Sequence, residues 1–216
     1  MHPLRQPDAR LGQSDCGHHF LHTNVILGHA RGASGEAEEH IENILTQAAA
    51  LKHRVWVSSM LFAELRPSMF AAGRFNTFHE FTRYIRSLVT LVTPDPNTML
   101  RVARLRDAKW QRPAGVRGAN EKPRMMSFSD AVQIASALWV KEAGSVADLR
   151  FLMFDDPSEA KGGARLSLLR LEDYAEDARA NSDVMAAVCL TRIQPSRQAP
   201  SIPRSASAGQ ESSAIS

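Results

Sequence analysis

The sequence has little cysteine and no long apolar run. These two absences argue against a disulfide-rich secreted protein and against a membrane-spanning protein. Cys16 and Cys189 are its two cysteines in 216 residues, and their spacing suggests neither a disulfide framework nor a zinc site. A reducing cytoplasm therefore suits the chain best. No apolar run approaches the roughly 18 residues that a membrane span requires, and the N-terminus lacks the apolar core of a signal peptide. We expect a soluble, cytoplasmic protein.

The net charge of the chain is also small. The formal charge of +3 permits nucleic acid as a partner but does not require it. With 44% apolar residues, a chain of this length can bury a core, so one domain is expected. Residues 1–19 lack periodicity and are predicted to be a disordered extension. The pair His18 and His19 could bind metal, but a solvated position just before the domain is the preferred interpretation. Residues 194–216 hold seven serines and three prolines and are predicted to be a disordered tail.

Apolar segments of strand and helix type alternate along the rest of the chain. Residues 20–27, FLHTNVIL, are typical of a buried strand that ends by exposing polar groups. Such alternation favours a parallel sheet covered on both faces. We predict a three-layer α/β/α sandwich over residues 20–173, with a mostly parallel sheet of four to five strands. Residues 174–193 could form a terminal helix. The predicted strands are residues 20–27, 55–57, 88–92, 151–154 and 166–171, and the longer helices are residues 36–51, 75–87, 99–110 and 127–143.

An acidic run opens the first of these helices. Its glutamates lie in the first turns, where negative charge complements the helix dipole, and Ser34 could cap the helix. Apolar residues up to Leu51 follow at the spacing of one buried face. We therefore interpret the run as helix stabilisation and not as a binding site. The glutamates are Glu36, Glu38, Glu39 and Glu42.

Three acidic residues stand where apolar segments begin or end. Glu64 lies in SSMLFAELRP, where a buried carboxylate is costly unless it is paired or bound to metal; a Glu that faces water is the alternative. Asp130 opens the helix SFSDAVQIASAL, in which Ser127 and Asp130 also fit a capping box. Asp155 follows FLMF directly, although Asp155 and Asp156 could simply form a turn. Because ligands gather at the carboxyl ends of parallel strands, we expect the three acids to meet at one metal site.

The order and context of these segments resemble the PIN-domain family of metal-dependent ribonucleases, especially the VapC-type toxins of toxin–antitoxin pairs. The resemblance covers about residues 20–171 and rests on FLHTNVIL, SSMLFAELRP, SFSDAVQIASAL and FLMFDD. It implies a cluster of acids, Glu64, Asp130 and Asp155, that binds Mg²⁺ or Mn²⁺ and hydrolyses RNA, with Asn24 and Asp156 in supporting positions. It also implies a small antitoxin protein as partner and a homodimer.

The chain departs from the family pattern in the first motif. His22 stands where the family has an aspartate, and Met153 stands where a threonine or serine is usual. Mg²⁺ prefers oxygen, whereas imidazole suits softer metals. Three interpretations follow: a weakened magnesium ribonuclease, a manganese ribonuclease with His22 at the metal, and an inactive relative that keeps its surfaces for RNA or antitoxin. Equally, His22 could be a buried histidine hydrogen-bonded to the backbone.

Residues 101–124 form the most basic segment, with eight cations against two carboxylates. This segment leads into the helix of Asp130, so it could bind RNA phosphates near the metal. A solvated helix and loop is the alternative interpretation. The candidate RNA-binding residues are Arg101, Arg104, Arg112, Arg117, Lys122 and Arg124.

Overall fold

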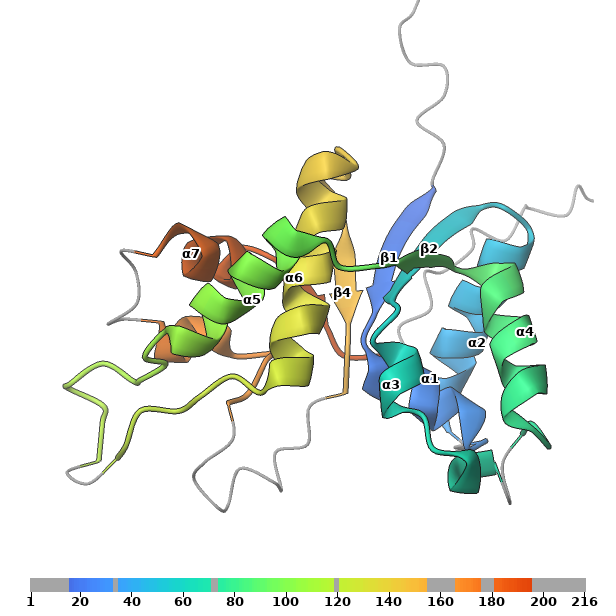
Figure 1. The fold of residues 1–216 in the computed structure, drawn as a ribbon, viewed down its shortest axis with the longest axis horizontal. Helices are drawn as coiled ribbons and strands as arrows, with labels where there is room; N and C mark the ends of the chain where they lie inside the picture. The colour runs from blue at the N-terminus through green and yellow to red at the C-terminus, as the bar shows by residue number, and fades with distance from the viewer. Residues whose placement is uncertain are drawn as a thin grey trace, which may run out of the picture.

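The computed structural model describes residues 16–32, 35–70, 74–118, 121–154, 166–175 and 181–195. The segments up to residue 15 and from residue 196, predicted to be disordered, lie outside the described residues, as do Asp155 and Asp156. The described chain forms a sheet with helices on both faces, which confirms the predicted three-layer α/β architecture (Figure 1). None of the described helices has the length and apolar character that crossing a bilayer would need.

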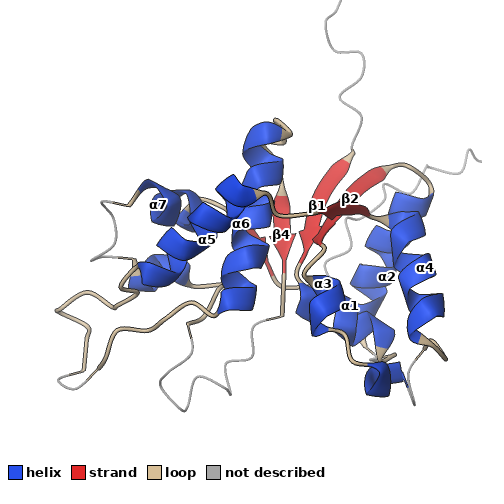
Figure 2. Cartoon of the chain, in the orientation of Figure 1, coloured by secondary structure: helices blue, strands red, loops and turns tan. Residues whose placement is uncertain are grey.

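Five parallel strands form the sheet in the order β3-β2-β1-β4-β5. Figure 2 shows β2, β1 and β4 side by side in the middle of the molecule. β1 lies in the centre, where Phe20 pairs with Trp56 of β2 on one side and with Phe151 of β4 on the other. The chain first builds β2 and β3 outward from β1 and then builds β4 and β5 on the opposite side, so the strand order reverses between β1 and β4. The strands are β1 (Gly17–Leu21), β2 (His53–Ser58), β3 (Thr90–Val92), β4 (Arg150–Leu152) and β5 (Thr191–Ile193).

Helices cover the two faces of the sheet in separate groups. Figure 1 shows α1 to α4 on one side and α5 to α7 on the other. Because side chains alternate along a strand, Phe20 and Phe151 pack in the core with α6, whereas Leu21 and Leu152 pack in the core with α1 and α2. The helices are α1 (Thr23–Ala30), α2 (Glu36–Ala49), α3 (Leu61–Glu64), α4 (Phe78–Leu88), α5 (Pro96–Asp107), α6 (Phe128–Ala143) and α7 (Ser182–Val188), with 3-10 turns at Pro67–Phe70 and Leu171–Tyr174.

The prediction of one strand over residues 20–27 is wrong. β1 ends at Leu21, and α1 starts two residues later. His22 lies between them as the N-cap of α1, because its Nδ1 accepts a hydrogen bond from the backbone N–H of Asn24. Ile26 is fully buried, so the apolar run reaches the core with helical spacing and not with strand spacing.

The predicted boundary of the domain at residue 20 is also too late. β1 begins at Gly17, so His18 and His19 belong to the sheet. His19 is buried, and its Nε2 lies 2.8 Å from Nδ1 of His53 on β2. His18 lies 2.9 Å from Asp148 instead of being only solvated.

A strand over residues 166–171 was expected but is not found. Leu166 and Leu168 are buried in irregular chain, so their alternating pattern packs on the core without joining the sheet. The fifth strand is β5, which follows α7 and pairs with β4. The described part of residues 174–193 therefore contains the end of a 3-10 turn, α7 and β5, and not the single terminal helix that the sequence suggests.

α2 has the predicted buried face, but its ends differ from the prediction. Leu51 is 89% exposed and has a φ of 59°, because the helix has already ended. Gly35 is the N-cap, and Ser34 lies outside the described residues. The buried face consists of Ile41, Ile44, Leu45 and Ala48.

Candidate functional site

The carboxyl ends of β1, β2 and β4 lie next to one another at one edge of the sheet. β1 leads to His22, β2 leads through α3 to Glu64, and β4 leads to Phe154, the residue before Asp155 in the chain. Ligands of open parallel sheets bind at such an edge where the strand order reverses. The topology therefore brings the predicted site segments to the place where a ligand is expected.

His22 uses both ring nitrogens within the protein. Nδ1 accepts the backbone N–H of Asn24 at 3.1 Å, so this nitrogen carries the lone pair. Nε2 lies 3.2 Å from Oδ1 of Asp130 and donates its proton there. The ring is buried. This geometry matches the interpretation of a histidine hydrogen-bonded to the backbone and leaves no ring nitrogen free for a metal in this conformation.

Asp130 lies both at the start of a helix and at the carboxyl ends of the strands, as the sequence suggests. Its backbone N–H donates to Oγ of Ser127 at 3.1 Å, as a helix cap requires. Its carboxylate is buried and faces His22 at the sheet edge. Ala131 and Ala135 are fully buried in the next turns of α6, so small side chains allow the helix to approach the sheet closely.

Asn24 fixes the chain that leaves β4. Its Nδ2 donates to the carbonyl of Phe154 at 2.6 Å, and its Oδ1 accepts the N–H of Phe154 at 3.1 Å. The side-chain amide of Asn24 thus makes the pair of hydrogen bonds that a neighbouring strand would make with the backbone of Phe154, just beyond the end of the sheet. Asn24 therefore positions the backbone immediately before Asp155.

Glu64 is the last residue of α3 and is half-buried. Within the residues that the structure describes, its carboxylate has no hydrogen-bond or ion-pair partner. The ligand atoms of His22, Asp130 and Glu64 do not all come within 4.8 Å of one another. The structure thus joins His22 to Asp130 and leaves Glu64 further off, and the metal-binding roles of Glu64, Asp130 and Asp155 stay predictions.

A row of buried polar side chains, Gln133 and Ser136, continues from Asp130 along α6 and is called the polar seam below. The sequence analysis missed it. Gln133 donates to Oγ1 of Thr23, and Oγ of Ser136 lies 3.3 Å from Oγ of Ser58 on β2. Oε1 of Gln133 is buried without a hydrogen-bond partner. The signal was present in the sequence, since Asp130, Gln133 and Ser136 recur on one face of an otherwise apolar helix.

A second group of potential metal ligands lies at the other end of α1. The ligand atoms of His29, Glu38 and Glu42 all come within 4.8 Å of one another. Nδ1 of His29 lies 2.5 Å from Glu38, and its Nε2 lies 3.2 Å from the hydroxyl of Tyr84. Arg74 pairs with both glutamates. Because Arg74 already supplies the positive charge, the group ties α1, α2 and α4 together, in keeping with a structural interpretation of the acidic run.

The first two cations of the basic segment hold helices together. Nε of Arg101 donates to Asp183 of α7 at 2.9 Å, and Nη2 of Arg101 donates to Glu142 of α6 at 2.9 Å. Arg104 also pairs with Asp183. Burial opposes ionisation of Asp183, but the hydrogen bonds from Arg104 and Arg101 outweigh it and hold the pKa of Asp183 below its ordinary value.

The loop cations gather around Tyr174. The guanidinium carbons of Arg112 and Arg124 lie 5.4 and 4.5 Å from the centre of its ring. Arg117 donates to the carbonyl of Arg112. Lys122 is exposed. Five of the six candidate RNA-binding residues therefore have partners within the chain, so the structural interpretation accounts for most of the segment, and RNA binding by these residues stays a prediction.

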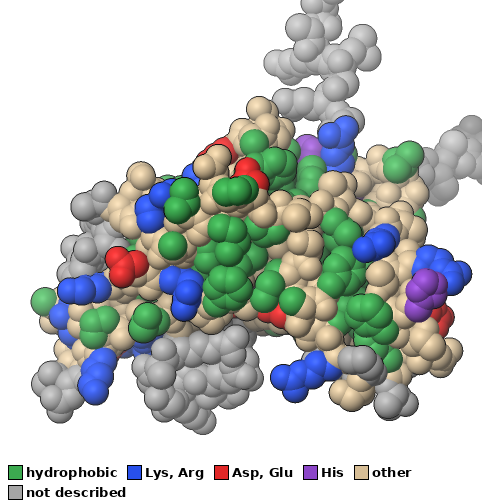
Figure 3. All heavy atoms as spheres, viewed as in Figure 1, with side chains coloured by type: hydrophobic (Ala, Val, Ile, Leu, Met, Phe, Trp, Pro, Cys, Tyr) green, Lys and Arg blue, Asp and Glu red, His purple; other side chains and the backbone are tan. Residues whose placement is uncertain are grey.

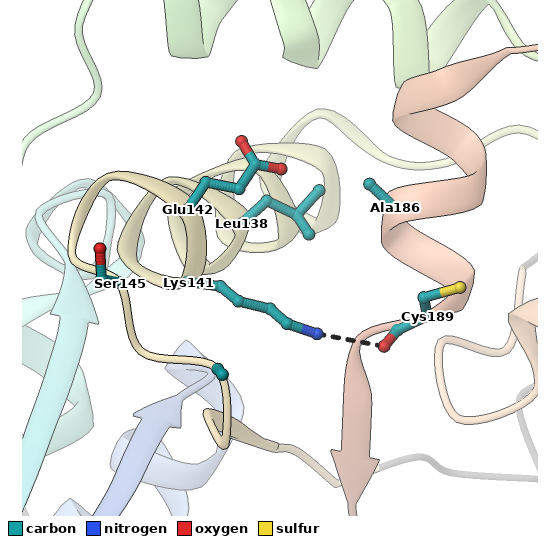
Figure 4. Close-up of a pocket in the computed structure, with 7 residues that line it drawn as sticks. Leu138, Lys141, Glu142, Ser145, Ala186 and Cys189 are labelled. Carbon is teal, nitrogen blue, oxygen red and sulfur yellow. Dashed lines mark hydrogen bonds between the residues drawn. The ribbon is translucent and has the colours of Figure 1, made fainter.

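A cavity of about 440 Å³ lies between the carboxyl half of α6 and α7 (Figure 4). Leu138 and Ala186 supply apolar walls, and Nζ of Lys141 lies 3.4 Å from the carbonyl of Cys189. Asp130 is at the opposite end of α6. The cavity is therefore separate from the carboxyl edge of the sheet.

Comparison with known proteins adds no family to this picture. No family model, no curated protein and no solved structure matches the chain.

Proposed function

We propose that the protein is a divalent-metal-dependent ribonuclease of the PIN type that hydrolyses phosphodiester bonds at the carboxyl edge of its sheet. The observation that supports this most is the position of Asp130. It is a buried carboxylate at the point where the strand order reverses, bonded to His22 across the edge. Burial of a carboxylate is costly, and active sites are where such costs are commonly found.

The donor atoms at this edge suit a hard divalent cation. Asp130 on α6 and Glu64 on α3 offer carboxylate oxygens, and Mg²⁺ in proteins is typically held by one or two carboxylates with water completing its shell. The unpartnered Oε1 of Gln133 adds an oxygen acceptor close to Asp130 in the helix. Asp130, Glu64 and, from the sequence, Asp155 would hold Mg²⁺ or Mn²⁺. Such an ion lowers the pKa of a water molecule and neutralises charge on phosphate oxygens.

His22 acts on this site through Asp130. Its Nε2–H fixes one carboxylate oxygen, so His22 is a positioning residue and not a ligand. The site carries one negative charge fewer than it would with an aspartate at this position. We therefore expect reduced activity in the native chain: a loss of about 3 kcal/mol of transition-state stabilisation corresponds to a rate on the order of a hundredfold lower.

A second candidate function follows from the same contact. Because both nitrogens of His22 are engaged, the protein could keep the fold and its binding surfaces while the metal site no longer works. It would then be an inactive module that binds RNA or an antitoxin. This alternative differs from the first proposal only in catalysis, so catalysis must be measured.

The deciding experiment is an RNA cleavage assay with Mg²⁺ and with Mn²⁺. We expect slow cleavage by the native chain, loss of cleavage in Asp130→Asn, and a rate about a hundredfold higher in His22→Asp. Activity only in His22→Asp would support the inactive module. An inert His22→Asp variant with every RNA and both metals would contradict the ribonuclease proposal.

The cellular setting is part of the proposal. We infer that the protein is the toxin of a toxin–antitoxin pair, with a small antitoxin protein as partner and a homodimer as the assembly. A reducing cytoplasm is consistent with Cys16 and Cys189, both of which are free thiols in the structure. A gene for a small protein directly upstream would favour this setting over general RNA processing.

A further inference from the structure

An aromatic side chain is exposed where α6 begins. Phe128 is the first residue of α6, is 43% exposed and belongs to neither core. Met125, just before the helix, is 67% exposed. The guanidinium of Arg106, in the last turn of α5, lies 5.5 Å from the centre of the Phe128 ring. The ring therefore stays in solvent beside a cation, two residues before Asp130.

Two cations at this end of the α5–α6 pair differ from most other cations of the basic segment. Arg106 and Lys109 are exposed, and neither has an ion pair or hydrogen bond within the described residues, whereas Arg101 and Arg104 are paired with Asp183. A bridge between Trp110 and Arg124 brings Lys109 and Met125 to the same end of the α5–α6 pair. Figure 3 shows apolar side chains gathered over α6 with Lys and Arg side chains beside them.

We propose that Phe128 and Arg106 form a subsite that stacks a nucleobase of single-stranded RNA beside the cleavage site. This inference rests on the proposed ribonuclease function and assigns its substrate contact to residues outside the six candidates chosen from the sequence. Nucleobases of every kind stack on aromatic rings, and Arg106 and Lys109 provide the positive charge that the adjoining phosphates require.

The subsite selects unpaired RNA. In an A-form duplex the base faces are stacked inside the helix, so an exposed ring cannot reach them. A single strand can turn one base onto Phe128 while the neighbouring backbone passes Asp130. The subsite thus favours a single-stranded segment or loop as substrate.

The test is equilibrium binding of a short fluorescein-labelled single-stranded RNA to the full chain in EDTA, so that no cleavage occurs. We expect Phe128→Ala to weaken binding about tenfold and Phe128→Trp to preserve it. The matched control is Phe78→Ala, because Phe78 is also the first residue of a capped helix and is 38% exposed, but it lies on α4. Arg106→Gln should lower the slope of log affinity against log salt by about 0.7.

Phe128→Ala should bind the same RNA in duplex form as tightly as the native chain does. The thermal unfolding of Phe128→Ala should match that of Phe78→Ala. Equal affinity of Phe128→Ala and the native chain for the single strand would overturn the subsite and leave the ribonuclease proposal standing. A change of oligomeric state in Phe128→Ala without a change in RNA binding would overturn it in favour of a protein contact. Failure of the native chain to bind any RNA would overturn the subsite, whereas the ribonuclease proposal is tested separately by the cleavage assay.

Discussion

At the scale of single residues, His22 combines a backbone contact at the start of α1 with a side-chain contact to Asp130. Its Nδ1 supplies the acceptor that the start of α1 needs, as an aspartate oxygen would. Its Nε2–H then donates to Asp130, whereas an ionised carboxylate at this position would have no proton to donate and would repel Asp130. Because an aspartate oxygen could also cap α1, we expect His22→Asp to change metal binding and catalysis more than folding.

His19 gives the chain a predicted sensitivity to acid. Burial, the neighbouring His53 and the charge of Arg150 lower the pKa of His19 to about 3, with smaller contributions from His40 and His18. The unfolded chain takes up a proton near the ordinary pKa of about 6.5, whereas the folded chain does not. The stability that neutral His19 contributes is thus fully present above its ordinary pKa of about 6.5 and is lost as the pH falls toward 3. The free energy of unfolding should fall by up to about 1.4 kcal/mol per pH unit for this one proton.

Denaturant unfolding at several pH values checks this expectation, with His19→Gln as the comparison. The variant should show a shallower fall in unfolding free energy between about pH 6 and pH 5, where carboxylates still contribute little. Parallel curves for the two proteins would mean that His19 becomes protonated in the folded chain without cost.

At the scale of elements, Asn24 joins α1 to the end of β4. Asn24→Ala removes both hydrogen bonds to the backbone of Phe154 and should lower the free energy of unfolding by about 1–3 kcal/mol. The amide hydrogen of Phe154 should also exchange faster. Unchanged stability and exchange in Asn24→Ala would show that the strand end is held by other contacts.

Asp183 links α7 to α5 through two arginines. Asp183→Asn should destabilise the fold by about 1–3 kcal/mol, because Asp183 is buried and both Arg101 and Arg104 would lose their ion pair with it. The matched control is Asp148→Asn at the exposed pair with His18, where a loss of about 0–1 kcal/mol is expected. Equal effects of the two variants in denaturant unfolding would contradict this difference.

The elements that the sequence predicted well are those with a full helical period. α2, α4, α5 and α6 show repeated apolar spacing over several turns, so local pattern and tertiary packing agree. The errors fall on short apolar runs. Residues 20–27 divide between a strand and a helix, and residues 166–171 are buried without joining the sheet. Pattern alone cannot separate a buried strand from buried irregular chain, because both need apolar residues and differ only in distant partners.

At the scale of the whole molecule, the sheet separates two chemically different edges. Its carboxyl edge carries His22 and Asp130, and its amino edge carries the His19–His53 pair. The meeting of His22 and Asp130 could be predicted from strand order and motif context. The polar seam through Gln133 and the arginine partners could not, because they depend on which helix faces point at one another.

The central claim is that Asp130 helps to bind a divalent cation at the carboxyl edge. The most direct measurement is Mn²⁺ binding by electron paramagnetic resonance to the native chain, Asp130→Asn and Glu42→Gln. Glu42 is the matched carboxylate control, because it belongs to the separate group around His29 and Arg74. The account predicts bound Mn²⁺ in the native chain and in Glu42→Gln and its loss in Asp130→Asn. Binding that survives in Asp130→Asn and disappears in Glu42→Gln would contradict it.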